Sequence, residues 1–287
     1  MRQMLLVMLL GVLLSGCISM QESTSIREEA VKKGLTVVRA LPRNLPDGVS
    51  PVPGTQYVLV KADSGVATAL SFAVPIPFVT DMAVAAANKR EAGQYASHYS
   101  VLDPYTIAVE RLQGSSLLSP RGDALHLMPV VYVLEGSDGI YRFTQVFRVE
   151  GDGWTGRYMY HLPTTYTAAQ ITNPQPEELE NLRKELVVGA DILRGLMERD
   201  ARGELKPNGT KVDIGSYYLV ASKALGMVPA SAYHYPGNDL VEDTGDHVIV
   251  RARGDKNASG NVGGLVFGVH YFLKSQLHTY KVSDAKK

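Results

Sequence analysis

Residues 124–162 read ALHLMPVVYVLEGSDGIYRFTQVFRVEGDGWTGRYMYHL, and this stretch decides the fold. It contains three runs rich in β-branched and aromatic residues, at 124–135, 140–150 and 154–162. The runs are separated by short connections of Gly, Ser and Asp, which are typical of hairpins. The stretch therefore predicts an antiparallel meander of three strands.

Side chains alternate along the second and third runs, as they do in a strand. One face of the second run carries Tyr141, Phe143, Phe147 and Val149, and the other carries Arg142, Thr144 and Arg148. One face of the third run carries Trp154, Tyr158, Tyr160 and Leu162, and the other carries Thr155, Arg157, Met159 and His161. Because an antiparallel sheet can bury one side and leave the other to water, we expect one buried face and one polar face.

A long amphipathic helix is expected at 176–199, after the meander. Pro176, Glu177 and Glu178 are suited to its first turn. Apolar residues recur at intervals of three and four, namely Leu179, Leu182, Leu186, Ala190, Leu193 and Met197. This spacing forms a single apolar stripe, which predicts that the helix lies across the sheet.

Weaker patterns complete an α+β fold, an antiparallel meander with one long helix packed on it and one or two shorter helices. Further strands are expected at 35–41, 56–62, 211–221, 246–253 and 264–274, the last extending to 282. Helical signals are found at 26–33, after Thr80 and at 103–113. The globular domain is predicted to span 34–282, with 167–175 as the one candidate internal boundary.

Residues 65–87 are the most apolar stretch after the N-terminal run, and Asp81 is their only charged residue. Pro75 and Pro77 interrupt the stretch, so it does not form one helix. We expect a buried extended piece, followed by a helix with Thr80 as its N-cap. A membrane-inserting or pore-lining hairpin is the alternative, which the prolines and the short length disfavour.

The N-terminus begins with the basic residue Arg2 and an uncharged apolar run of eleven residues, 4–14. This run is too short to cross a hydrocarbon core, which takes about 20 helical residues. It is typical of the h-region of a secretory signal, and Leu14-Ser15-Gly16-Cys17 closes it. An ordinary secretory signal and an uncleaved membrane anchor are the alternatives.

Residues 14–17 match the lipobox of bacterial lipoproteins, which reads Leu, small, small, Cys, and residues 1–17 resemble the signal of that class. The resemblance implies that 1–16 is a cleaved signal, that the Cys17 thiol carries a diacylglyceryl group, and that 17–33 is a tether. Two or three acyl chains hold a protein firmly at a membrane. Since residue 18 is Ile and not Asp, the resemblance also implies the outer membrane, with the protein facing the periplasm.

The composition is that of a globular protein, with 45% hydrophobic and 20% charged residues. Cys17 is the only cysteine, so stability must come from core burial and not from disulfides. The net charge is zero, which argues against nucleic acid as a partner because such binding needs a basic field. A content of 15 Tyr against 6 Phe favours half-exposed sheet faces.

Motifs for catalysis are lacking in the sequence. It has no His-Glu-x-x-His metal motif, no Gly-x-Ser-x-Gly elbow, no phosphate-binding loop and no dinucleotide fingerprint. The one Ser-x-x-Lys, Ser283 to Lys286, lies in the terminal tail. We therefore predict no cofactor and no catalytic residue. The histidines that a His-based mechanism would most readily recruit are His161, His234, His247 and His270.

Acidic residues crowd one segment near the start of the expected strand 246–253. They are Asp239, Glu242, Asp243 and Asp246. Oxygen ligands this close in sequence could hold Ca²⁺. The spacing of an EF-hand is absent, however, so we favour a solvated acidic loop that leads into the strand.

Together these features predict a lipid-anchored, non-catalytic binding protein of the bacterial cell envelope. Its partners would be the membrane, through the lipid on Cys17, and another protein of the envelope. Envelope assembly or secretion, and immunity against a periplasmic toxin, are both compatible with this prediction. The alternative is an envelope hydrolase that acts on peptidoglycan or lipid through a site without a recognised motif.

Overall fold

The computed structural model describes residues 22–42, 45, 49–61, 77–119, 124–136, 138–216, 233–254 and 266–283. Its strands are β1 (Leu35–Val37), β2 (Val49–Pro51), β3 (Tyr57–Lys61), β4 (Leu125–Glu135), β5 (Ile140–Gly151), β6 (Trp154–Thr167), β7 (Lys211–Ser216), β8 (Tyr233–Asp243), β9 (His247–Ala252), β10 (Gly268–Leu273) and β11 (Leu277–Val282). The helices are α2 (Glu28–Lys33), α4 (Pro77–Tyr99), α5 (Pro104–Leu112), α6 (Ala168–Thr172), α7 (Pro176–Ala201) and the short 3₁₀ helix η1 (Lys274–Gln276).

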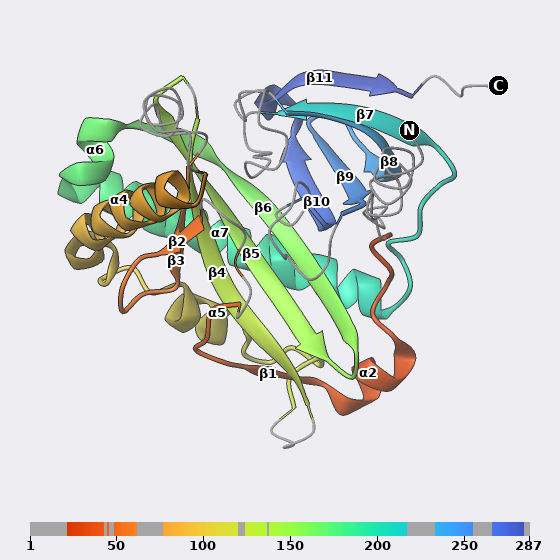
Figure 1. Ribbon diagram of the computed structural model, residues 1–287. Coiled ribbons are helices and arrows are strands. Elements are labelled where there is room, and N and C mark those ends of the chain that lie inside the picture. The colour runs from red at the N-terminus through yellow and green to blue at the C-terminus, as the bar shows by residue number, and fades with distance from the viewer. Residues whose placement is uncertain are drawn as a thin grey trace, which may run out of the picture.

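The described strands form one sheet of eleven strands, which dominates a mixed α/β fold (Figure 1). The strand order is β11-β7-β8-β9-β10-β6-β5-β4-β3-β2, and β1 pairs with β4 beside this path. Most pairs are antiparallel, as predicted. The pairs β1–β4, β3–β4 and β6–β10 are parallel, which the hairpin signals did not indicate.

The predicted meander is confirmed as β4, β5 and β6 in the middle of the sheet. Val130 on β4 pairs with Val146 on β5, which in turn pairs with Met159 on β6. The β5–β6 register shifts between Arg142 and Thr144, as in a β-bulge. Strand β6 runs five residues beyond the predicted end at Leu162.

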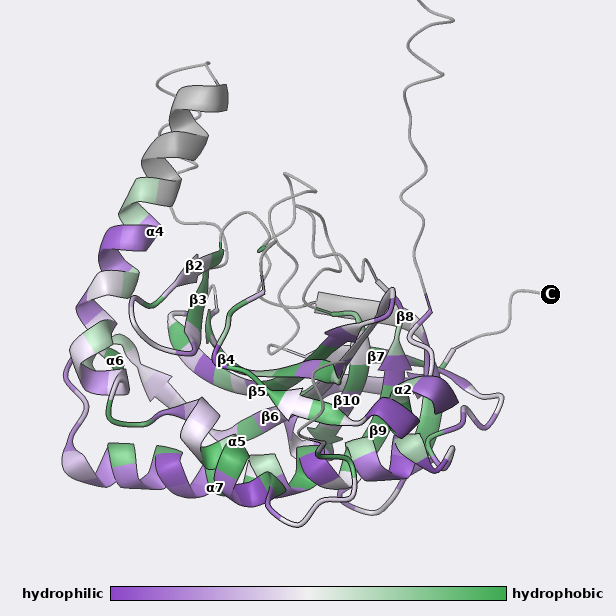
Figure 2. Cartoon of the chain, turned by 90° about the horizontal axis from the view of Figure 1, so that it is seen from below, coloured by the Kyte–Doolittle hydropathy of each residue, from purple (hydrophilic) through white to green (hydrophobic). Residues whose placement is uncertain are grey.

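The predicted helix at 176–199 is present as α7, which runs along one face of the sheet (Figure 2). Its stripe is buried in the main core, with Leu186, Ala190 and Leu193 each 0% exposed. Gly189 lets α7 approach β5 and β6 closely. A Cβ atom there would lie 2.2 Å from Oε1 of Gln145 and 2.7 Å from Cδ1 of Tyr160.

The prediction of a single long helix is not confirmed, because α4 is a second one, with 23 residues. It begins at Pro77, before the expected N-cap Thr80, and continues to Tyr99. Its C-terminal half packs on the main core through Ala92, Tyr95 and Tyr99, which are 0%, 3% and 2% exposed. These residues are spaced by three and four. The stripe combines one small and two half-polar residues, so its apolar character is weak in the sequence.

The polar face of the meander is also buried. Arg148 and Arg157 are cross-strand neighbours with exposures of 5% and 0%, and Thr144 is 2% exposed. A second cluster, which includes Val130, Val146 and Met159, fills this face and is contacted by Val38, Leu41, Leu45 and Val49. The segment that follows β1 therefore covers a face that periodicity alone marks only as polar.

The acidic segment proves to be mostly a strand. Asp239, Glu242 and Asp243 lie on β8, and Asp246 lies in the turn before β9. Strand β8 pairs with both β7 and β9, so tertiary pairing overrides the low β propensity of acidic residues. The short edge strand β2 was also not predicted.

Two further predictions concern the joints between elements. Helix α5 begins as expected, because the Asp103 carboxylate accepts hydrogen bonds from the N–H groups of Tyr105 and Thr106. The candidate boundary 167–175 holds α6, and the same sheet continues on both sides of it.

No helix among the described residues is long and apolar enough to cross a membrane. Of the stretch 65–87, residues 65–76 lie outside the described residues, so its extended first part is not tested.

Candidate functional site

Two of the four histidines that a His-based mechanism would most readily recruit lie together where β6 pairs with β10. His161 and His270 are each 1% exposed, and their rings stack with centroids 5.4 Å apart and planes 8° apart. Nε2 of His161 lies 3.1 Å from Nδ1 of His270. The parallel pairing of β6 and β10 brings together these residues, which are separated by 109 positions.

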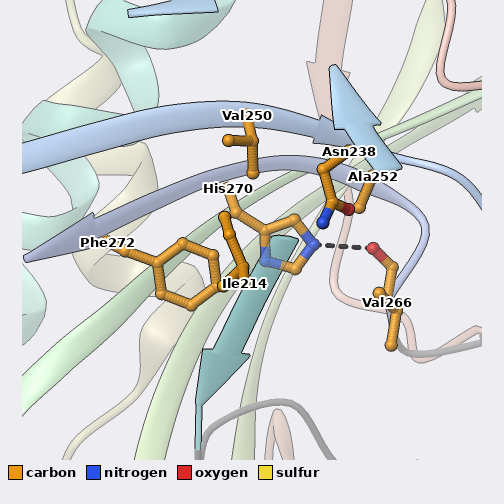
Figure 3. Close-up of a pocket in the computed structure, with 7 residues that line it drawn as sticks. All are labelled: Ile214, Asn238, Val250, Ala252, Val266, His270 and Phe272. Carbon is orange, nitrogen blue, oxygen red and sulfur yellow. Dashed lines mark hydrogen bonds between the residues drawn. The ribbon is translucent and has the colours of Figure 1, made fainter. Parts of the chain in front are cut away.

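The hydrogen-bond partners of His161 and His270 determine which nitrogen of each ring carries the proton. Nε2 of His270 lies 2.6 Å from the carbonyl oxygen of Val266, so it must donate (Figure 3). Nδ1 of neutral His270 is then an acceptor, and Nε2 of His161 donates to it. Nδ1 of His161 is left as an acceptor for the Thr144 hydroxyl at 2.9 Å. These four residues form a one-way chain of hydrogen bonds, which we call the Thr144–His161–His270 chain.

Burial keeps both rings neutral. Loss of hydration lowers the pKa of His161 well below its usual value, and the neighbouring His270 adds to the effect. Loss of hydration also lowers the pKa of His270 to about 4. The Val266 carbonyl opposes this shift, and the Arg157 charge reinforces it. At neutral pH the Thr144–His161–His270 chain therefore holds no charge of its own.

A hydroxyl that donates to an imidazole, which is oriented by a third group, is the arrangement of an activated nucleophile. The surroundings do not suit that chemistry. The hollow beside His270 has no room for a water molecule and is lined largely by apolar side chains such as Ile214, Val250 and Phe272 (Figure 3). Because Thr144 is 2% exposed and the pKa of His161 is low, the base is weak and closed to a substrate.

The Thr144–His161–His270 chain should make the stability of the protein depend on pH. The unfolded state binds protons at His161 and His270 below about pH 6.5, while the folded state does not until a lower pH. The contribution of the two histidines to the free energy of unfolding should therefore be fully present above pH 6.5. It should decrease as pH falls toward 4, by on the order of 3 kcal/mol from His270 alone. Urea unfolding at pH 7.5 and 4 measures the difference, which should shrink in His270→Phe. An equal pH dependence in that variant would contradict the assignment.

The other two histidines lie apart from this seam. His247 stacks on Tyr271 with centroids 4.5 Å apart, and its Nε2 lies 3.0 Å from Oε1 of Glu242. His234 lies on β8, and its side chain is outside the described residues, as are Cys17 and Lys286.

The acidic candidates are engaged by other side chains of the protein. Asp239 pairs with Lys211, Glu242 with Arg199 at 2.5 Å, and Asp243 with Lys274 at 2.5 Å. Asp246 binds the Thr244 hydroxyl at 3.0 Å and His247 at 3.1 Å. Burial alone would raise the pKa of Glu242, but its bonds to Arg199 and His247 lower it. In the described part of the chain, no three His, Cys, Asp or Glu side chains converge as metal ligands.

A buried ion pair holds the N-terminal segment against the body. Arg251 on β9 and Asp200 at the end of α7 are paired, and they are 3% and 1% exposed. The Tyr158 hydroxyl donates to Asp200 at 2.7 Å, and so does the backbone N–H of Ile26 at 3.2 Å. Arg251 also donates to the Ser25 hydroxyl at 3.0 Å. We call these five residues the Asp200 clasp.

A second hollow, of about 290 Å³, opens where β11 begins. It is lined by Arg142, Pro163, Thr165, Ser275, Gln276, Leu277 and His278, and we call it the β11 pocket. The Gln276 amide ties this corner to β6 by donating to the carbonyls of His161 at 2.9 Å and Leu162 at 3.1 Å. Sequence reasoning missed both the clasp and the pocket, since their residues come from distant segments.

The fold and these features define a mixed α/β protein built on one mostly antiparallel sheet, with a sealed polar seam. In comparisons with known proteins, no family model, no curated protein and no solved structure matches the chain.

Proposed function

We propose that the protein is a lipid-anchored lipoprotein of the cell envelope, held at the outer membrane and facing the periplasm, which binds another envelope component without catalysis. The lipobox ending at Cys17 supports the anchor. The Asp200 clasp is the structural observation that carries the proposal, because it ties the chain to the body shortly after that cysteine.

An ion pair just before the clasp limits the distance between lipid and body. Glu22, five residues after Cys17, is already paired with Arg253 at 2.7 Å. Five extended residues reach at most about 18 Å. Lipid on Cys17 would therefore keep the body at the membrane surface, as suits a protein that acts on a partner in or near that membrane.

Lipidation can be tested directly. Cells that express the full chain are grown with a clickable fatty-acid analogue, and membranes are separated by density. The wild-type protein should take up label and sediment with the outer membrane, whereas Cys17→Ala should take up none. Ser19→Ala, two residues away, should behave as wild type. Equal labelling of wild type and Cys17→Ala would refute the anchor.

One observation favours the hydrolase alternative, namely the contact between the Thr144 hydroxyl and His161. If this contact were catalytic, Thr144→Val would abolish turnover of peptidoglycan or phospholipid, and Thr144→Ser would retain it. The burial of both residues and the low pKa of His161 make non-catalytic binding the better-supported function.

A further inference from the structure

Strands β6 and β10 join two parts of the sheet (Figure 1). The strand order continues as β9-β8-β7-β11 beyond β10 and as β5-β4-β3-β2 beyond β6. The first part has an apolar cluster of its own, which includes Val212, Leu240, Val248 and Phe272. In the described residues, the register between β6 and β10 comprises three pairs, namely Tyr158 with Val269, Met159 with His270 and Tyr160 with Tyr271. We call this short parallel pairing the β6–β10 seam.

The two faces of the seam are held in different ways. On the face toward α7, Val269 lies in the main core, and the rings of Tyr160 and Tyr271 have centroids 5.8 Å apart. The Asp200 clasp reinforces this face, because it ties β6 and β9 to the end of α7. The opposite face holds His161 and His270. The seam can therefore open on the histidine face while α7 keeps the two parts of the sheet attached.

The histidine face is unsuited to an added positive charge. The charges that act on the two rings come from His270, which acts on His161, and from Arg157, which acts on His270, and both lower the pKa. Arg157 is itself 0% exposed. The side chains that reach this place from β7, β8 and β9 are uncharged, namely Ile214, Asn238 and Val250 (Figure 3).

The other charged groups on this face of the meander are already paired. Arg142 and Arg148 lie on β5, and each is held by a carboxylate close to it in the sequence, Asp138 and Glu150 respectively. Neither carboxylate is therefore at hand to stabilise an imidazolium at the seam. Water would have to do so, and the hollow beside His270 has no room for it while the seam is closed.

We propose that the β6–β10 seam is an acid-sensitive joint, in which protons taken up by the Thr144–His161–His270 chain separate β10 from β6 on the histidine face, while α7 and the Asp200 clasp hold the two parts together. A first proton can stay in the closed seam only if His161 changes its tautomer, and it then lies beside Arg157 without hydration. A second proton places two N–H groups face to face across the 3.1 Å contact. Opening hydrates both rings, so acid shifts the population toward the open form.

Opening must also release Gln276. Its amide spans the seam on this side and donates to the carbonyls of His161 and Leu162. The β11 pocket is lined from both parts of the sheet, by Pro163 on β6 and Leu277 on β11 among others, so its shape should change with the joint. The inference does not depend on the lipid anchor or on a partner. It goes beyond a loss of stability in acid, because it states where the structure opens first.

Hydrogen exchange of the full-length protein measures the opening. Exchange at pH 7.5 and pH 5 is followed by mass spectrometry and corrected for its intrinsic pH dependence. Peptides that cover 157–162 and 268–273 should show an opening equilibrium at least about thirtyfold larger at pH 5. The reason is that the pKa of His270 is about 4 in the closed seam and returns to about 6.5 when water reaches the ring. Peptides from 126–134, on β4 and away from the seam, should change less than about threefold.

Glutamine variants remove the titration and keep the main hydrogen bonds. The amide of His270→Gln can still donate to the Val266 carbonyl, and that of His161→Gln can still donate toward residue 270. The response to pH should decrease in each single variant and fall below about threefold in the double variant. It should remain complete in the control His247→Gln, whose ring lies apart from the seam. Three results would overturn the proposal: equal protection of the seam at both pH values, an equal loss of protection in 126–134, or a complete response in all the glutamine variants.

Discussion

Replacing Asp200 with alanine should lower the free energy of unfolding by about 3–5 kcal/mol. The substitution leaves the Arg251 guanidinium buried at 3% exposure without its carboxylate, and it removes the acceptor for the Tyr158 hydroxyl and the Ile26 N–H. The N-terminal segment should also detach, so proteolysis near Ser25 should accelerate. Urea unfolding and limited digestion of the full chain measure both effects.

A matched control lies on the same helix. Asp191 pairs with Arg111 at 2.7 Å, but the two side chains are 36% and 43% exposed, so Asp191→Ala should cost less than about 1 kcal/mol. The double variant Asp200→Leu with Arg251→Met removes both charges and should recover the part of the loss that comes from the unpaired guanidinium. Similar costs for Asp200→Ala and Asp191→Ala would show that the clasp is not a structural anchor.

Leu186→Asp should destabilise the fold by about 4 kcal/mol or more, because it puts an unpaired carboxylate into the main core. Leu186 is 0% exposed at the middle of the α7 stripe, where the helix packs on the sheet. Thermal melting followed by circular dichroism measures the loss. A melting temperature close to that of wild type would mean that α7 does not pack as described.

Val188→Asp is the control for this substitution. It introduces the same charge two residues further along α7, at a position that is 51% exposed. Its effect should remain within about 0.5 kcal/mol. A large loss in both variants would point to a general effect of charge on the helix and not to burial of the stripe.

Elements with a strong local period were predictable. The meander β4–β5–β6 follows from alternation and from Gly/Asp connections, and α7 follows from a stripe spaced by three and four, both readable within a few residues. Helix α4 was only partly predictable. Its C-terminal half is ordered by Ala92, Tyr95 and Tyr99, and their apolar character becomes decisive only against the aromatic rings of the core, such as Phe143, whose centroid lies 5.9 Å from that of Tyr99.

The candidate site was predictable in one contact only. Thr144 and His161 are cross-strand neighbours in the β5–β6 hairpin, so the meander already implies that they can meet. His270 belongs to a strand that pairs with β6 in parallel, and nothing local specifies that partner. The burial that keeps both rings neutral also depends on this distant strand, which is why four histidines looked alike in the sequence.

By itself the sequence determined the features that depend on neighbours along the chain, namely the hairpins and the apolar stripe of α7. The tertiary structure alone decided which polar residues are buried and what satisfies them. Asp200 finds Arg251 across 51 positions, and Glu242 finds Arg199 across 43. The reason is physical: periodicity arises from local geometry, whereas desolvation and ion pairing depend on groups that only the folded chain brings together.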